Sequence, residues 1–176
     1  TPDNQYRSYK EREQIFGVAD EFDFNYHPES AYQTPIYSLL RFDLKMTVDF
    51  VIKFIDKVTD NLITYYSDSE VPTGKLIIDD TTSEVVLDQY LWGAYRGADG
   101  APDIVKSILM ALEKFFLERA KDTEAKYLEL WLKYLLKHTK SSAICGVVAS
   151  IVLANRDKLF NVAMILFEVK AFIQFD

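Results

Sequence analysis

The sequence has few of the residues that build metal, redox or thiol chemistry. It contains one cysteine, Cys145, and two histidines, His27 and His138, among 176 residues. Because zinc sites need clustered cysteine and histidine ligands, these three scattered residues argue against a zinc site. A single cysteine also leaves no intrachain disulfide, which is typical of cytoplasmic proteins. Cys145 lies in an apolar run with no basic neighbour, so we expect a buried hydrophobic residue rather than a reactive thiol.

Dense basic segments and long apolar runs are also missing. The chain carries 20 Lys and Arg against 27 Asp and Glu, for a net charge of −7. Nucleic-acid binding needs concentrated positive charge, and an anionic membrane surface repels an acidic protein. The longest apolar stretch, Ala143 to Ala154, is shorter than the roughly 20 residues of a membrane-spanning helix, and no signal peptide opens the chain. We therefore expect a cytoplasmic protein without a nucleic-acid or membrane partner.

Nucleotide-binding and hydrolase motifs are incomplete. Residues 73–76 place one glycine before Lys75 and lack the serine or threonine that completes a phosphate-binding loop. The three glycines within residues 93–100 have the wrong spacing for a dinucleotide-binding turn. No Gly-x-Ser-x-Gly nucleophile elbow occurs. These departures leave no motif on which to assign a cofactor.

Scattered polar residues suggest structural roles instead. Asp79, Asp80 and Glu84 could together hold a hard cation, but the solvated tip of a hairpin is the favoured interpretation. His138 stands at a predicted helix end, where we expect it to interact with the helix dipole. We predict that the chain is not itself an enzyme, and we assign it no catalytic residue, no cofactor and no metal.

The residues that are present predict a core and many helices. Hydrophobic types make up 49% of the chain, enough for a substantial buried core. The chain begins at Thr1-Pro2 without methionine and ends directly after a helical pattern, from which we expect one structural unit within a longer polypeptide. Its fold class is expected to be mainly α, built from antiparallel helix pairs as an α-solenoid (HEAT- or TPR-like) or a helical-bundle fragment.

The first segment, residues 1–33, is expected to contain a helix over 5–16 and an aromatic and acidic loop. Residues 34–66 predict a helix pair. Thr34 is expected to cap a short helix from Pro35, and Asp43 to cap a longer one over 44–66. The 3.6-residue period of the longer helix indicates one inward stripe. The residues of that stripe are Phe50, Val51, Phe54, Ile55, Val58 and Leu62.

Residues 67–100 predict a hairpin and loop insertion between helices. Two short apolar runs indicate strands over 75–79 and 84–87, joined by a turn at 80–83, so the hairpin falls around residues 75–88. Residues 89–97 are compatible with more than one state.

Residues 101–176 predict a four-helix repeat segment. Its helices are expected to begin near Pro102, Thr123, Ser141 and Asp157, the last continuing to about residue 172. Small residues in the third helix allow close approach, so we expect that helix to be central. The inward residues expected in the first two helices are Ile104, Ile108, Leu109, Leu112, Phe115, Phe116, Tyr127, Leu128, Trp131, Leu135 and Leu136.

One cluster has the composition of a contact surface. Tyr90, Trp92, Tyr95 and Arg96 lie close together in the sequence, and these residue types are enriched at interface hot spots. The alternative is that Trp92 and Tyr95 pack the insertion onto the helices. Both interpretations stay open at this point.

The order of several segments resembles a known family. The segments are Gln33–Leu40, Leu91–Gly97, Met110–Lys114 and Val147–Ala154 followed by Lys158–Asn161. Together they resemble a helical sensor or scaffold region of large bacterial STAND-type P-loop NTPases of the antiviral defence kind, over about residues 30–176. The resemblance implies that the ATPase and effector lie elsewhere in the parent protein. It also implies that this piece senses a foreign, phage-derived protein or transmits that event, and it maps no catalytic residue here.

Three functions are weighed on this basis. The first is a non-catalytic scaffold that binds protein, either other domains of its parent or a foreign protein. The second is a stand-alone hydrolase or transferase using carboxylates in a helical pocket, which predicts a pocket with convergent polar groups. The third, a nucleic-acid-binding module, predicts salt-sensitive affinity.

Overall fold

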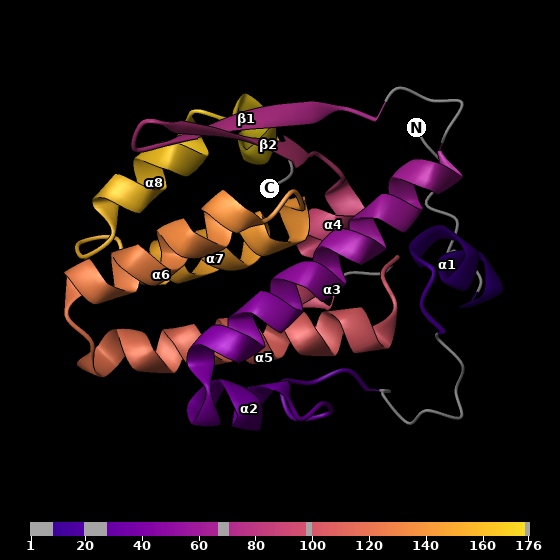
Figure 1. Ribbon diagram of the computed structural model, residues 1–176, viewed down its shortest axis with the longest axis horizontal. Helices are drawn as coiled ribbons and strands as arrows, with labels where there is room; N and C mark the ends of the chain where they lie inside the picture. Colours follow the sequence, from indigo (N-terminus) through magenta and orange to yellow (C-terminus); the bar gives the residue numbers. More distant parts are fainter. Residues whose placement is uncertain (1–8, 20–27, 67–70, 98–99, 175–176) are drawn as a thin grey trace.

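The computed structural model describes residues 9–19, 28–66, 71–97 and 100–174. This part of the chain is mainly helical and carries a single two-stranded antiparallel hairpin, as the sequence predicts (Figure 1). No helix in it is both long and apolar enough to cross a membrane. The elements in order are α1 (Tyr9–Phe16), α2 (Ile36–Phe42), α3 (Leu44–Tyr65), β1 (Thr73–Ile78), β2 (Thr81–Val86), α4 (Gln89–Gly93), the 3₁₀ helix η2 (Ala94–Arg96), α5 (Asp103–Asp122), α6 (Ala125–His138), α7 (Ser142–Ala154), α8 (Phe160–Phe167) and α9 (Lys170–Gln174).

The end of α1 and the start of α2 are set by different backbone features. The predicted stop of α1 at Gly17 is confirmed, because Gly17 has a φ of 63°, a left-handed conformation that glycine adopts without steric cost. The predicted cap at Thr34 is wrong. Pro35 is the N-cap of α2 and makes no side-chain cap bond, while the buried Thr34 hydroxyl has no hydrogen-bond partner among the described residues.

Helix α3 has its predicted cap but a different buried face. The Asp43 carboxylate accepts a hydrogen bond from the backbone N–H of Met46 at 3.0 Å, which satisfies one free donor of the first turn. Phe50 was expected to point inward, yet it is 51% exposed, and Phe54 is half-buried. Thr47 is buried in the first turns instead, because the helix is rotated toward its Val48 and Val51 side. The inward prediction for Phe50 is therefore wrong.

The hairpin is confirmed, with a shorter turn than expected. Strands β1 and β2 pair from Thr73 opposite Val86 to Ile78 opposite Thr81. The turn is therefore the pair Asp79-Asp80, and the prediction of a turn over 80–83 is wrong. Asp79 takes a φ of 52°, a left-handed conformation that aspartate tolerates better than most residues.

The segment that the sequence left unassigned, residues 89–97, is helical. The Asp88 carboxylate accepts hydrogen bonds from the N–H groups of Tyr90 and Leu91, both at 2.9 Å, and starts α4. The chain then tightens into η2 and stops at Gly97, whose φ is 73°. This short helical turn brings Trp92 and Tyr95 against α7.

Helix α7 is central, as its small residues predict. It contacts α3, α4, η2, α5, α6 and α8, and Figure 1 shows it running beside α6 in the middle of the molecule. Its N-cap is Ser141, whose hydroxyl accepts from the N–H of Ala143 at 3.3 Å. Tyr127 of α6 was expected inward but is 52% exposed, so that prediction is wrong. Ile104 and Trp131 are half-buried at the edge of the core.

The last predicted helix is divided in two. Helix α8 ends at Phe167, and α9 begins at Lys170 after a turn at Glu168 and Val169. The single helix predicted from Asp157 or Lys158 to about residue 172 is therefore wrong. The turn buries Val169 against Gly74 of β1 and lets Phe172 stack on Trp92. These tertiary contacts outweigh the local preference for a continuous helix.

A single hydrophobic cluster joins the described elements. It runs from Ile15 and Phe16 of α1 through α3, the hairpin and α5 to α7, and reaches Phe172 of α9. The predicted helix pair and the predicted four-helix segment thus share one core, with the hairpin packed against α6 and α8.

Candidate contact surfaces

The predicted contact cluster is mostly interior. Trp92 and Tyr95 are each 3% exposed, Tyr90 is half-buried and Arg96 is exposed. The Trp92 ring stacks on Phe172 with centroids 4.5 Å apart and planes 20° apart. Arg96 Nε donates a hydrogen bond to the Tyr95 hydroxyl at 2.6 Å. These positions fit the packing interpretation, in which the two aromatic residues hold the insertion on the helices.

The same stack forms one wall of an apolar pocket. The pocket has a volume of about 180 Å³, below the roughly 300 Å³ lower end for pockets that bind small molecules and cofactors. No titratable side chain lines it. It fits a single side chain of a partner better than a cofactor. Its lining residues are Trp92, Ala149, Val152, Leu153, Ala163, Leu166, Phe167 and Phe172.

An exposed apolar surface adjoins this pocket. Phe160 is 66% exposed, Met164 46% and Phe167 55%, and their spacing places them on one side of α8. Leu153 of α7 is 47% exposed and lines the pocket together with Phe167. We refer to these four residues as the α8 face. The α8 face thus combines a ridge of large apolar side chains with the adjoining apolar pocket, which can accept one further side chain.

The composition of α8 makes this exposure unusual. Asn161 is its single polar residue between Phe160 and Phe167. A helix that is apolar on all sides normally lies wholly inside a core. The inner side of α8, including Val162 and Leu166, is buried, yet its outer side faces solvent. The sequence predicted only a helix for this segment, although its uniform apolar character distinguishes it from an ordinary surface helix.

A second set of exposed apolar residues lies on α2 and α3. Phe42 is 87% exposed, Met46 57% and Phe50 51%. Charged residues separate them along the helix, and Lys45 pairs with Asp49 at 2.5 Å within the same stretch. A charged pair therefore lies beside these apolar residues, and they provide positions for control substitutions.

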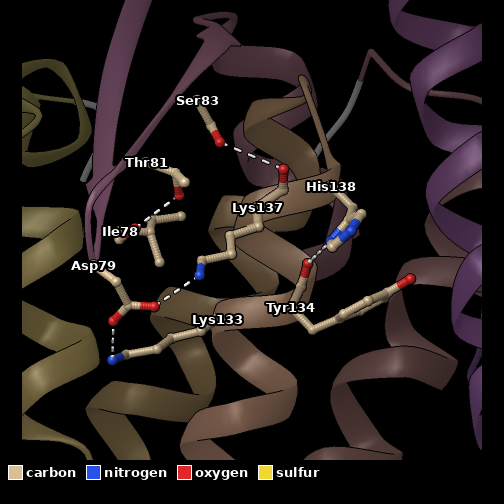
Figure 2. Close-up of polar contacts among 8 residues, drawn as sticks. All are labelled: Ile78, Asp79, Thr81, Ser83, Lys133, Tyr134, Lys137 and His138. Atoms are coloured by element: carbon tan, nitrogen blue, oxygen red, sulfur yellow. Dashed lines mark hydrogen bonds and ion pairs between the residues drawn. The ribbon is translucent and has the colours of Figure 1, made fainter.

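One acidic residue of the hairpin tip, Asp79, binds two lysines. Asp79 accepts from Lys137 at 2.7 Å and from Lys133 at 2.9 Å, both on α6 (Figure 2). Hydrogen bonds from these two ammonium groups, that of Lys137 first, hold the pKa of Asp79 at about 2. The Ser83 hydroxyl also donates to the Lys137 carbonyl at 3.4 Å. The tip is thus latched to α6, and the described residues contain no group of three potential metal ligands.

His138 also has a local structural role. Its Nδ1 lies 2.9 Å from the carbonyl oxygen of Tyr134, one turn earlier in α6, and its ring stacks on the Tyr134 ring at 4.0 Å (Figure 2). This position at the last turn of the helix agrees with the dipole interpretation. Tyr134 in turn donates to Asp49 of α3 at 2.6 Å, so the group ties α6 to α3.

Two carboxylates have raised pKa values. Burial raises the pKa of Glu113, against the hydrogen bond from the Ser150 hydroxyl that lowers it. Burial likewise raises the pKa of Asp56, which accepts from the Thr139 hydroxyl at 2.8 Å and from a backbone N–H at 3.1 Å. Neither carboxylate lines the apolar pocket. They are bound to different helix seams and do not form an acid–base pair around one cavity.

A buried lysine fastens the loop before α2 to α5. Lys106 pairs with Asp103 at 2.7 Å and with Glu29 at 3.1 Å, and its side chain is 4% exposed. Burial alone would lower the pKa of Lys106, but the hydrogen bonds to both carboxylates outweigh it and leave that pKa raised. The lysine is held charged and fully paired, which suits a structural role rather than that of a nucleophile.

The cysteine is as inert as the sequence suggests. Cys145 is fully buried on α7, and burial raises the pKa of its thiol above the ordinary value. A protonated, inaccessible thiol is a poor nucleophile and a poor metal ligand.

Comparison with known proteins adds no further assignment. No family model matches the chain, and no curated protein matches it.

Proposed function

We propose that this chain is a non-catalytic helical scaffold that binds another protein through the α8 face. The observation that carries the proposal is the half-exposure of a helix that is apolar on all sides. Large exposed apolar patches rimmed by polar residues mark interaction sites. Asn161, hydrogen-bonded to Glu129 of α6 at 3.2 Å, and the exposed charged residues around Arg156 supply such a rim.

The partner element that fits this face is an amphipathic helix. Phe160, Met164 and Phe167 form a ridge of the kind that packs into the groove of a second helix. The neighbouring pocket of about 180 Å³ can then accept one apolar side chain from that helix. Aromatic residues that fill pockets at interface centres contribute most of the binding energy.

The arrangement of the helices supports a bundle in preference to a solenoid. In a solenoid each repeat contacts only its neighbours in the sequence. Helix α7 contacts α3 and α4 as well as α6 and α8, so the elements surround one central helix. We propose that α8 is the outer helix of this bundle and the place where a further helix adds to it.

The parent of this scaffold is proposed from the family resemblance. The segment order described above resembles large bacterial STAND-type NTPases of the antiviral defence kind. A scaffold with an open helical face suits such a protein, because sensing and transmission both require a contact that forms and breaks. The test is the sequence that flanks this chain in its gene: a P-loop motif there would support the placement, and a parent gene without one would argue against it.

The α8 face is tested by crosslinking and matched substitution in the full-length polypeptide. A photo-reactive phenylalanine analogue at position 160 should crosslink to apolar positions three and four residues apart on a partner helix. A synthetic peptide of that helix should bind with at least tenfold lower affinity to Phe160→Ser with Phe167→Ser. The control, Phe42→Ser with Phe50→Ser, changes two other exposed phenylalanines and should leave affinity unchanged. The proposal would be refuted if both double variants lost the same affinity for the peptide. It would also be refuted if the analogue gave the same crosslinks at position 42 as at position 160.

A further inference from the structure

The outer edge of β1 carries backbone groups that no described residue satisfies. Two backbone hydrogen bonds at the end of the hairpin define which groups these are. Leu87 N–H donates inward to Pro72 C=O at 2.8 Å, and Val86 N–H donates outward to Lys140 C=O at 2.8 Å. Because inward and outward groups alternate along a strand, Thr73, Lys75 and Ile77 of β1 direct their N–H and C=O groups away from β2.

The two edges of the hairpin differ in this respect. The β2 edge is partly covered, since Val86 pairs with Ser141 in a short parallel bridge next to its bond with Lys140. The β1 edge has no backbone partner within the described part of the chain. Figure 1 shows β1 along the upper rim of the molecule with β2 on its inner side. Unpaired strand edges are templates for a further strand.

We propose that the β1 edge binds an extended peptide strand of a protein partner by adding it to the hairpin. This contact is separate from the α8 face, and its chemistry is that of backbone pairing, so an extended segment fits it and a helix does not. Three outward N–H groups and three outward C=O groups, at Thr73, Lys75 and Ile77, set the register of the added strand.

The exposed side chains beside the edge define the sequence of that strand. Lys75 and Ile77 are both exposed, and Ile77 is 55% exposed. Lys75 forms no ion pair within the described residues, because its cross-strand neighbour Glu84 accepts a hydrogen bond from Thr73 at 2.9 Å instead. A carboxylate across from Lys75 and an aliphatic residue across from Ile77 complement this edge. Lys75 also disfavours pairing of two copies in the register that opposes it to itself.

Two contacts hold the hairpin against the helices. Asp79 ties its tip to Lys133 and Lys137 of α6, and Gly74 packs against Val169 at the end of α8 (Figure 2 for the tip). An edge that is already fixed loses little conformational freedom when a strand is added, and this preorganisation favours binding.

The probe for this edge is a synthetic peptide in which every second residue is threonine. The residues between the threonines are glutamate and valine by turns. Titration into the full chain, followed by amide NMR, should shift and slow the exchange of the N–H groups of Thr73, Lys75 and Ile77. Those of Gly74, Leu76 and Ile78, already paired with β2, should change less. Absence of shifts at β1 with millimolar peptide, or shifts confined to α8, would overturn the proposal.

Matched variants separate edge pairing from general loss of structure. Ile77→Pro removes an outward N–H that the hairpin itself does not use, so the fold should persist while peptide binding is lost. Ile77→Val keeps that N–H and should bind as the wild type does. Lys75→Glu should weaken binding of the glutamate peptide by roughly fivefold and favour the corresponding lysine peptide. Equal binding of both peptides to Lys75→Glu would contradict the proposed register.

Discussion

The backbone carbonyl of Trp92 lies directly against Gly146, so that α4 and α7 touch without a side chain between them. A Cβ atom at position 146 would lie closer than 3.0 Å to that carbonyl oxygen. The same added Cβ atom would lie 3.0 Å from Cε1 of the Tyr95 ring. Gly146 therefore determines how closely α4, which follows the hairpin in the insertion, can pack against the central helix α7.

Replacing Gly146 should weaken the packing of α4 against α7. Gly146→Ala is expected to lower the free energy of unfolding by roughly 1–3 kcal/mol, because the added methyl group meets rigid backbone that has no room to move. Urea unfolding followed by circular dichroism measures the change. Ala154→Ser, at the exposed end of the same helix, should alter the free energy of unfolding by less than about 0.5 kcal/mol. A stability of Gly146→Ala equal to that of the control would mean that α4 does not pack as described.

The latch at the hairpin tip should depend on pH and salt. Lys137 and Lys133 depress the pKa of Asp79 from 3.8 to about 2 in the folded chain. The stabilisation by a depressed carboxylate is complete above its unfolded pKa and is lost as the pH falls through its folded pKa. Asp79→Asn should therefore be less stable than wild type at neutral pH and equal to it below about pH 2.

The comparison is made through urea midpoints measured across that pH range. Asparagine tolerates the left-handed backbone of position 79, so the substitution removes charge and leaves the turn intact. Asp80→Asn, the neighbouring turn residue without an ion pair among the described residues, serves as the control. The difference between wild type and Asp79→Asn should shrink in high salt, since the pair is exposed. A difference that persists unchanged at low pH would show that the carboxylate charge is not its source.

Thiol reactivity should report unfolding of the core. The thiol of Cys145 is buried on α7 with a raised pKa, so a thiol reagent should modify the native chain far more slowly than the chain in denaturant. Ala154→Cys in a Cys145→Ala background places the thiol at an exposed position of the same helix and should react at once. Fast labelling of native Cys145 would place this residue at an accessible surface and contradict its burial.

The stack between Trp92 and Phe172 should control the apolar pocket. Phe172→Ala removes one wall and should expose the Trp92 ring, giving a red shift of its fluorescence in a Trp131→Phe background. The loss of stability should fall below the roughly 3–5 kcal/mol typical of core phenylalanine, because the short helix α9 can detach locally. Phe167→Ala, which removes another lining residue but keeps the stack, should shift the emission less. Unchanged emission in Phe172→Ala would exclude the stacked arrangement.

Local sequence patterns predicted several helix starts and stops correctly. Asp43 and Ser141 start helices because their side chains can satisfy N–H groups two or three residues away. Gly17 ends one because it alone, among its neighbours, adopts a left-handed φ without cost. The small residues of α7 predicted its central position, and the burial of Cys145 followed from its apolar run. All of these depend on interactions between residues close in the chain, or on side-chain size.

Local sequence patterns did not predict which helix faces are exposed to solvent. Phe50 and Tyr127 fit an apolar stripe yet face solvent, while Trp92 and Tyr95 have an interface composition yet lie inside. Which side of an apolar helix is covered depends on elements far away in the chain, and periodicity contains no information about them. The outer side of α8 and the outer edge of β1 stay uncovered by the described residues, because α6, α7 and β1 pack on the inner side of α8 and β2 pairs with the inner edge of β1.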